Sequence, residues 1–423
     1  MRLVLFALLL SIPFAYSLVV ESTNSAGLHP ALYGDAIAFE QDGKIFVYDL
    51  SKKELREISK GSNPSLFAFT VAFETKEDEE DLNSDGDKDD TVIQFANIRD
   101  KKITSTNAAG HHPHAFSSFI TFSTKESELG IDFSNDGDMV DDIIRQYDID
   151  KKETANLKAV GDFPVLNQHA LLFLTEEKQV DADLNADGDK SDSILRVLDQ
   201  DSRKVSNTKI PAESLMLAKS GNAVFVSDGE IIIFDSVEQK SKGTKQRGNS
   251  PSLFDDVVIF ERDGKLFGYA LKSESIANLN VVGSNPSLFE NIVAFVSSEK
   301  EVGDLNGNNV VEESIVRFAR EEDIDGDDAY DFVDNCAAII NEDQEDSSNN
   351  GVGDACETKK ESPKPESKSE SSEPQVAQNA TETPVSESKG IAWYWYLLAI
   401  VLLPFVAYYG YKYYKKRQKS FGF

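Results

Sequence analysis

The stretch G-S-N-P-S-L-F-A-F-T-V-A-F, residues 61–73, decides the fold of this chain because the sequence repeats it. Its skeleton is G-x-x-P-x-L, a short gap, and then two or three apolar residues that end in phenylalanine. A phrase that recurs at intervals of roughly 20 to 50 residues is typical of a solenoid or a propeller. Seven copies, the fifth of them worn, end at Phe39, Phe73, Phe122, Phe173, Phe225, Phe260 and Phe295.

The segments after each phenylalanine complete a four-stranded unit. A hairpin turn leads to an alternating strand such as K-I-F-V-Y-D, residues 44–49, and a short polar strand such as E-L-R-E-I-S closes the unit. Short β-branched and aromatic strands separated by turn residues predict a propeller blade. We therefore predict an all-β, seven-bladed propeller over residues 18–320. A sandwich also has short strands, but it would not repeat one phrase seven times.

The seventh copy ends after its third strand, near Arg320. The residues that follow the expected signal peptide, L-V-V-E-S-T from Leu18, belong to no copy of their own. We expect them to supply the missing outer strand and to close the ring, which removes an exposed sheet edge.

Repeat length varies at one hairpin, between the second and third strands. Copies 1, 5 and 6 make a bare D-G turn there, whereas copies 2, 3, 4 and 7 insert an acidic loop. The insertions should share one face of the disc with the G-x-x-P entry turns, which carry His29, His111 and His112.

Three of the inserted loops carry a calcium signature, first seen as D-L-N-S-D-G-D-K-D-D at residues 81–90. Oxygen-bearing side chains recur at loop positions 1, 3, 5, 7 and 10, and glycine supplies the turn at position 6. Calcium takes six to eight hard oxygen ligands, and this spacing presents them around a tight turn. The predicted ligands are Asp81, Asn83, Asp85, Asp87 and Asp90 in copy 2, Asp132, Ser134, Asp136, Asp138 and Asp141 in copy 3, and Asp183, Asn185, Asp187, Asp189 and Asp192 in copy 4.

The fourth inserted loop, Asp304 to Glu313, departs from the signature. It has Asn309 where glycine is expected and Val310 at position 7. We therefore expect the loops of copies 2, 3 and 4 to bind calcium and the loop of copy 7 to bind weakly or not at all.

The repeated phrase resembles the TolB-like and related PD-repeat propellers, in which P-x-x-x-x-x-G-x-x-I-A-F precedes an I-Y-V-Y-D-L strand. The match covers most of residues 26–320. It implies the propeller fold and is nearly silent on activity, because propellers host many functions.

Residues 321–357 contain D-I-D-G-D-D-A-Y-D-F-V-D-N-C at 323–336 and D-S-S-N-N-G-V-G-D-A-C at 346–356. This pattern resembles a thrombospondin type 3 repeat, a calcium-binding unit with almost no apolar core. Asp328, Ala337 and Glu342 depart from its pattern, and a plain acidic linker is the alternative. Cys336 and Cys356 keep the family spacing, and an even cysteine count in an exported chain itself suggests one disulfide. The resemblance implies calcium ligands at Asp323, Asp325, Asp327, Asp331 and Asp334, and at Asp346, Ser348, Asn350, Asp354 and Glu357.

The two ends of the chain predict a single-pass membrane protein with its ectodomain outside the cell. Residues 1–17 read as a secretory signal peptide. Residues 391–411 are uncharged, apolar and flanked by aromatic residues, and a basic cytoplasmic tail follows at 412–423. A buried core helix is the alternative for 391–411. Residues 358–390 predict a disordered stalk, with a glycosylation sequon at Asn379.

The net charge of −31 argues against nucleic acid as a partner. A salt-adapted surface is an alternative source of the acidity, but lysine is plentiful and outnumbers arginine. The cluster His111, His112 and His114 could bind zinc or copper if it converged with another ligand, although exposed turn histidines are the simpler interpretation. Arginines such as Arg145 are expected on outer strands and turns, which argues against a sialidase-like site.

Two functions remain open. The first is a calcium-binding adhesion ectodomain whose partner is a surface glycan, an envelope polymer or a protein. The second is an extracytoplasmic calcium-dependent enzyme, such as a lyase, hydrolase or lactonase. The innermost strands offer few acid, base or nucleophilic groups, and no hydrolase, nucleotide-binding or zinc-protease motif is present. We therefore expect binding and assign no catalytic residue.

Overall fold

A computed structural model describes residues 18–78, 80–217, 221–320, 325–327, 329, 331, 334–336, 339–347 and 352–357. The predicted signal peptide, stalk, Asn379 sequon, membrane-spanning segment and basic tail lie outside these residues, as do Asp323, Ser348 and Asn350. Within the described part of the chain, no helix is long and apolar enough to cross a membrane.

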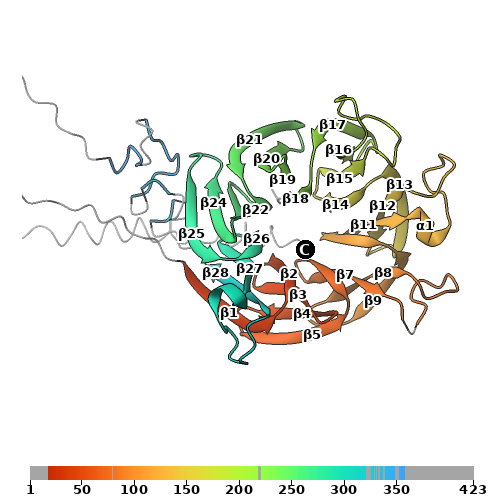
Figure 1. Ribbon diagram of the computed structural model, residues 1–423, viewed down its shortest axis with the longest axis horizontal. Coiled ribbons are helices and arrows are strands. Elements are labelled where there is room, and N and C mark those ends of the chain that lie inside the picture. Colours follow the sequence, from red (N-terminus) through yellow and green to blue (C-terminus); the bar gives the residue numbers. More distant parts are fainter. Residues whose placement is uncertain are drawn as a thin grey trace, which may run out of the picture. The chain divides into compact units, whose positions relative to one another are not determined.

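Seven four-stranded antiparallel sheets are arranged in a ring, as Figure 1 shows, and they confirm the predicted seven-bladed propeller. In blades 1 to 4, from the inner to the outer strand, the elements are β2 (Leu28–Tyr33), β3 (Ala36–Gln41), β4 (Lys44–Asp49) and β5 (Glu54–Lys60); β6 (Ser62–Phe67), β7 (Thr70–Lys76), β8 (Thr91–Asn97) and β9 (Ile103–Ala109); β10 (His111–Phe116), β11 (Phe119–Lys125), β12 (Asp142–Asp148) and β13 (Glu153–Val160); β14 (Asp162–Leu166), β15 (Ala170–Glu176), β16 (Ser193–Asp199) and β17 (Val205–Pro211).

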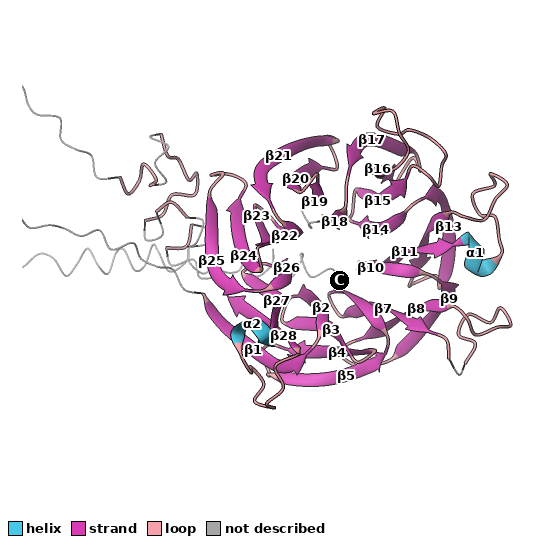
Figure 2. Ribbon diagram, in the orientation of Figure 1, coloured by secondary structure: helices cyan, strands magenta, loops and turns pink. Residues whose placement is uncertain are grey.

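The remaining blades follow the same order, although the worn fifth copy has a short inner strand. Two four-residue helices, which the sequence analysis did not predict, lie in the inserted loops of blades 3 and 7 (Figure 2): α1 (Glu126–Leu129) and α2 (Glu299–Val302). The strands are β18 (Ser214–Leu217), β19 (Asn222–Ser227), β20 (Glu230–Asp235) and β21 (Lys240–Arg247); β22 (Asn249–Phe254), β23 (Val257–Arg262), β24 (Lys265–Ala270) and β25 (Ile276–Val282); β26 (Ser284–Phe289), β27 (Ile292–Ser298) and β28 (Ser314–Arg320).

The N-terminal strand β1 (Val19–Ala26) closes the ring, as predicted. It pairs antiparallel with β28, from Val19 opposite Arg320 to Ala26 opposite Ile315. Thr23 Oγ1 donates a buried hydrogen bond of 2.7 Å to the carbonyl oxygen of Val316. The first and last parts of the propeller are therefore joined in one sheet.

The core of the propeller lies between blades. Seven buried apolar clusters are present among the described residues, one for each pair of neighbouring blades. Between blades 2 and 3, for example, Ala72 and Ile93 pack with Ile120 and Phe122. Each repeat phenylalanine is fully buried in such a cluster, which explains why the phrase always ends in this residue.

The glycine and the phenylalanine of the repeated phrase are in contact. A Cβ atom added to Gly110 would lie 2.4 Å from Cδ2 of Phe122 and 2.8 Å from the carbonyl oxygen of Ser123. The same close approach recurs between Gly61 and Phe73. The entry turn therefore passes directly over the second strand, and no side chain fits between them.

The inner edge strands also bond from blade to blade. The side chain two residues before the end of one inner strand accepts a hydrogen bond from a backbone amide of the next blade. Ser65 accepts from Ala115 at 3.0 Å, and His114 Nδ1 accepts from Leu166 at 3.1 Å. Ser252 and Ser287 do the same for Leu288 and Leu32. These bonds satisfy amides that an edge strand would otherwise leave unpaired.

Replacing Gly110 by Ala is expected to destabilise the propeller by about 1 to 3 kcal/mol, because the new methyl group overpacks the contact with Phe122. Chemical denaturation would measure the change. Gly34→Asn is the control, because that turn position has open space around it and a φ of 56°, which asparagine tolerates. Equal stability of the Gly110→Ala variant and the wild type would contradict the proposed contact.

Candidate metal centres and the central channel

The four acidic loops connect the second and third strands of blades 2, 3, 4 and 7, as predicted. In each loop the residue after the second strand and the last loop residue bond through their backbones. Glu77 N donates to the carbonyl oxygen of Asp90 at 2.9 Å in blade 2, for example. In Figure 2, α1 and α2 lie at the outer side of their blades, away from the channel.

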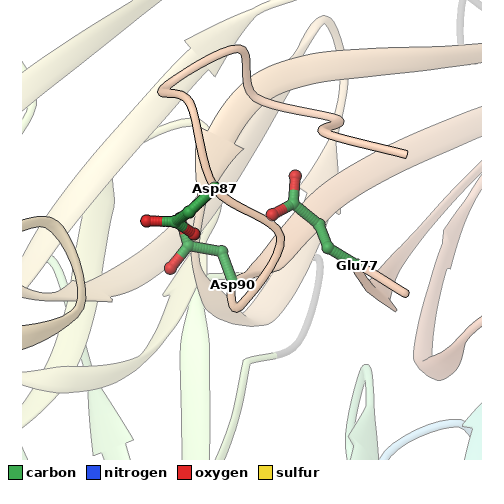
Figure 3. A group of neighbouring side chains, drawn as sticks. All are labelled: Glu77, Asp87 and Asp90. Atoms are coloured by element: carbon green, nitrogen blue, oxygen red, sulfur yellow. The ribbon is translucent and has the colours of Figure 1, made fainter. Parts of the chain in front are cut away.

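The blade 2 loop brings three carboxylates together. Ligand atoms of Glu77, Asp87 and Asp90 all lie within 4.8 Å of one another, as Figure 3 illustrates. Asp81 holds the turn, since its two oxygens accept the amides of Ser84 and Gly86. The geometry therefore joins loop positions 7 and 10 to a residue that lies before the loop.

The remaining predicted ligands of blade 2 form the frame of this loop. Asn83 Nδ2 donates to Asp85 at 3.0 Å and to Asp90 at 2.6 Å. Asp85 Oδ1 accepts the amide of Asp87 at 3.2 Å. Asn83, Asp85 and Asp90 are thus joined through their side chains, and Asp87 joins them through its backbone amide.

Glu77 is the ligand candidate that the sequence analysis missed. It is 2% exposed, and its Oε1 accepts the amides of Leu82 at 2.5 Å and Asn83 at 3.2 Å. Its Oε2 is buried and has no hydrogen-bond partner among the residues that the structure describes. A buried carboxylate oxygen without a partner is costly, and a bound cation would satisfy it.

The blade 3 and blade 4 loops follow the same plan. Their acidic groups within 4.8 Å are Asp136, Asp138 and Asp141 in blade 3, and Glu177, Asp189 and Asp192 in blade 4. Position 1 again accepts the loop amides, through Asp132 in blade 3 and Asp183 in blade 4. Position 3 also joins each frame, because Ser134 donates to Asp132 and Asn185 donates to Asp187 and Asp192.

A buried glutamate lies beneath each of these loops. Glu126 Oε1 accepts the amide of Ser134 at 2.7 Å, and Glu177 Oε1 accepts that of Leu184 at 2.5 Å. Both glutamates are 0% exposed. The sequence does contain a signal for them, because glutamate stands four residues after the repeat phenylalanine in every copy with a loop. In copies with a bare turn, that position is the turn glycine.

Burial raises the pKa of the carboxyl groups at loop position 10. Burial, followed by the hydrogen bond with Asp85, raises the pKa of Asp90 to about 6. Burial raises the pKa of Asp141 to about 7, and the charges of Asp136 and Glu126 add to the shift. Without a cation, the folded protein thus tends to retain protons in these loops.

The segment before the predicted stalk contains a fourth acidic cluster. Asp325, Asp327 and Asp334 have ligand atoms within 4.8 Å, and Asp331 is buried as well. The predicted disulfide joins Cys336 to Cys356. The structure does not bring the second predicted set into such a cluster: Asp354 bonds to Ser347, and Asp346 and Glu357 also belong to no carboxylate cluster in the described part of this segment.

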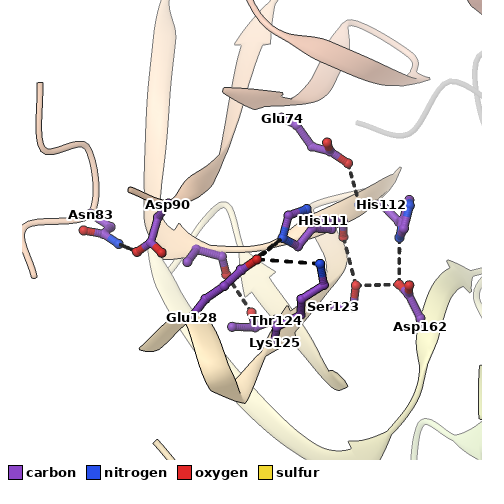
Figure 4. A network of polar contacts seen from close by, with 11 residues as sticks. Glu74, Asn83, Asp90, His111, His112, Ser123, Thr124, Lys125, Glu128 and Asp162 are labelled. Atoms are coloured by element: carbon purple, nitrogen blue, oxygen red, sulfur yellow. Dashed lines mark hydrogen bonds and ion pairs between the residues drawn. The ribbon is translucent and has the colours of Figure 1, made fainter. Parts of the chain in front are cut away.

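The histidines do not converge. Figure 4 shows His111 bonded to Glu128 at 2.9 Å and His112 bonded to Asp162 at 2.8 Å. His114 is half-buried, desolvation lowers its pKa to about 4, and its Nδ1 accepts the amide of Leu166. No cluster of potential metal ligands in the described ranges contains a histidine.

The channel contains a cavity of about 510 Å³ lined by the inner strands. One end carries the residues that precede the repeat prolines, all with positive φ: His29, Asn63, His112, Phe163, Ser250 and Asn285. At the other end of the same strands, aromatic rings touch in a row. Tyr33 lies 4.8 Å from Phe67 and 4.3 Å from Phe289, measured between ring centroids, and Phe116 and Phe254 extend the row. We call these five residues the aromatic arc.

The channel holds few groups for acid–base or ionic chemistry. Among its described lining residues, Glu213 is the only carboxylate, and none is an arginine. Arg145, Arg196 and Arg317 were expected on outer strands and turns, and they lie on the third strands β12, β16 and β28, each covered by a fourth strand.

No protein-family model matches this chain, and no curated protein matches it. Similar solved structures include an oligogalacturonate lyase in complex with manganese (9% identity, TM-score 0.46, covering 72% of this chain and 95% of that chain) and the β-propeller domain of the Trilobed protease from Pyrococcus furiosus (10%, 0.47, 65% and 90%). TolB from Acinetobacter baumannii is a third (12%, 0.37, 69% and 78%).

These likenesses concern the β-propeller fold alone. The topology and the loops define the class of this protein: a seven-bladed propeller, closed by its N-terminal strand, with carboxylate clusters in inserted hairpins. The propeller implied by the resemblance to TolB-like proteins is thus confirmed as a fold, and the thrombospondin-like identity of residues 321–357 stays a prediction.

Replacing Glu77 by Gln is expected to remove cation stabilisation from blade 2 while leaving the cation-free protein at least as stable as the wild type. The amide retains Oε1 as an acceptor but removes the buried charge. At a calcium concentration 100 times the dissociation constant, one lost site corresponds to about 2.7 kcal/mol of unfolding free energy. Denaturation with and without calcium would measure this, with exposed Glu80→Gln as the control. Equal calcium stabilisation of both variants would exclude Glu77 as a ligand.

Asp141 is expected to make the metal-free protein less stable as pH rises from about 4 to about 7. Its pKa is raised in the folded state to about 7, so the unfolded chain, with a carboxyl pKa of about 4, binds fewer protons across this range. Thermal denaturation of metal-stripped protein at several pH values would show the loss. Asp141→Asn should flatten this part of the profile, and identical profiles for variant and wild type would refute the assignment.

Proposed function

We propose that this chain is a calcium-binding propeller that acts as a binding or adhesion ectodomain, held at the cell surface by a single membrane-spanning helix. The observation that carries the proposal is the buried glutamate beneath each loop. In blades 2 and 3, Glu77 and Glu126 each direct one oxygen to loop amides and bury the other without a partner in the described structure.

The donor set favours calcium over other cations. The loops offer carboxylate, amide and hydroxyl oxygens, with no imidazole or thiolate in any described cluster. Hard oxygen ligands in this number suit calcium, whereas zinc and copper prefer nitrogen and sulfur. Magnesium retains several waters and rarely uses a cage made wholly of protein oxygens. Bound calcium would supply positive charge that offsets the negative charge of the carboxylates at position 10.

The channel favours binding over catalysis. An enzyme needs a base, an acid or a nucleophile that converge on one point of the substrate. The inner strands instead present prolines, amides and the aromatic arc, and His112 is already paired with Asp162. A channel with polar groups at one end and aromatic rings at the other suits a ligand with both hydroxyls and apolar faces, such as a surface glycan or envelope polymer.

The location of the protein rests on its sequence. The signal peptide, the apolar run at 391–411 and the basic tail support a single-pass anchor with the propeller outside. The stalk would then hold the propeller away from the bilayer. This arrangement suits display of a rigid binding domain, and the high acidity of the chain is compatible with calcium-rich surroundings.

Binding to an array of immobilised envelope polysaccharides tests the proposed function. The full chain in detergent should bind with calcium and lose binding on chelation, without releasing cleaved or unsaturated sugar. Tyr33→Ala in the aromatic arc should weaken binding at least tenfold, whereas Phe69→Ala, an exposed aromatic residue outside the channel lining, should not. Accumulation of product would favour the calcium-dependent enzyme, and an absence of calcium-dependent binding would overturn the proposal.

A further inference from the structure

The acidic loop of blade 7, residues 304–313, keeps the frame of the other three loops despite its different sequence. Asp304 accepts the amides of Gly307 at 2.7 Å and Asn309 at 2.9 Å, as Asp81 does at the same two positions of its own loop. The missing glycine is therefore no obstacle. Asn309 has a φ of 63°, and asparagine is among the residues that adopt the left-handed conformation most readily.

A buried glutamate lies beneath this loop too. Glu299 is 1% exposed, and its Oε1 accepts the amides of Leu305 at 2.7 Å and Asn306 at 3.3 Å. Its Oε2 is buried without a hydrogen-bond partner within the described chain. This is the arrangement of Glu77, down to the two loop positions whose amides it binds.

The last loop position carries a longer carboxylate. Glu313 Oε2 accepts Nδ2 of Asn306 at 2.7 Å and Nδ2 of Asn308 at 2.8 Å. In blade 2 the corresponding acceptor is Asp90, which binds Asn83 at 2.6 Å. The Oδ1 atoms of Asn306 and Asn308 each accept one loop amide and keep a second lone pair, so the loop has carboxylate and amide oxygens available for a hard cation.

We propose that this loop and Glu299 form a fourth cation site in the propeller, weaker than the other three. It has three carboxylates at the corresponding positions, Glu299, Asp304 and Glu313, where blade 2 has five. These three do not gather within 4.8 Å of one another as the carboxylates of blades 2 to 4 do. Calcium affinity decreases when a site offers fewer charged ligands. The proposal rests on the calcium role of the other loops and adds a site that fills at higher calcium concentration.

The position of this site ties it to closure of the ring. Glu299 N donates to the carbonyl oxygen of Glu313, and β28 begins at the next residue. The other edge of β28 pairs with β1, and Gly27 N donates to the carbonyl oxygen of Ser314 at 2.8 Å. A cation that orders this loop therefore also orders the strand on which the N-terminal strand closes the propeller.

Hydrogen exchange of the full-length chain during a calcium titration tests the site locally. Peptides from 299–313 and from β1 should gain protection, at a midpoint about tenfold higher than peptides from the blade 4 loop. Glu299→Gln should abolish the change in 299–313, and Glu301→Gln, an exposed neighbour, should leave it intact. Val310→Asp restores a carboxylate at position 7 and should lower the midpoint at least fivefold, which gives a gain-of-function test that does not depend on the folding of the Glu299 variant.

The outcomes separate this inference from the proposed function. Calcium-dependent protection in blades 2 to 4 with none in 299–313 would overturn the fourth site alone. An unchanged midpoint in Val310→Asp would also count against it. If no loop responds to calcium, the proposed function itself fails. Protection of 299–313 that disappears in Glu299→Gln would support the site.

Discussion

The contact between the entry glycine and the phenylalanine, present in six of the seven repeats, is the constraint on which the rest of the structure depends. Where Gly110 crosses Phe122 there is no room for a Cβ atom, so the entry turn lies directly on the second strand. The phenylalanine then anchors the apolar cluster between two blades, and the turn sets the mouth of the channel. Four residues after that phenylalanine the chain either turns at once or opens into an acidic loop, so the loops and the channel mouth share one face.

Much of the fold and part of the candidate site were predictable from sequence. The repeat gave seven blades, the unassigned N-terminal strand and the hairpin that receives the insertions, because periodic patterns determine strand order directly. The loop spacing identified residues such as Asp87 and Asp90, whose carboxylates do meet. Glu77 was not predicted because it lies outside the loop motif. It comes close to the loop only in the folded structure, where its Oε1 accepts a backbone amide of the loop. The aromatic lining of the channel was not predicted either, because aromatic residues on inner strands are usually interpreted as core residues.

The acidic loops make stability depend on solution conditions in a way that the apolar core does not. Burial of Glu77 or Glu126 as an anion costs free energy, and a single hydrogen-bonded oxygen recovers only part of it. The seven apolar clusters between blades contribute favourable burial free energy whether or not a cation is bound. The core therefore accounts for the fold, and the buried glutamates are the groups that a bound cation would stabilise. A hydrophobic residue at these positions would cost less free energy to bury, but it would leave the loop amides without a hydrogen-bond acceptor.

The departures from the repeat carry as much information as the repeat itself. Blade 4 has Asn167 where most blades have an aromatic residue, and the inner strand of blade 5 has none. The aromatic arc is consequently open on the side of blades 4 and 5, so the channel is asymmetric although the propeller is built from similar units. Repeats that keep their core but vary at the channel retain stability while the lining changes. The fold tolerates the worn copy because the neighbouring blades still cover both faces of its sheet.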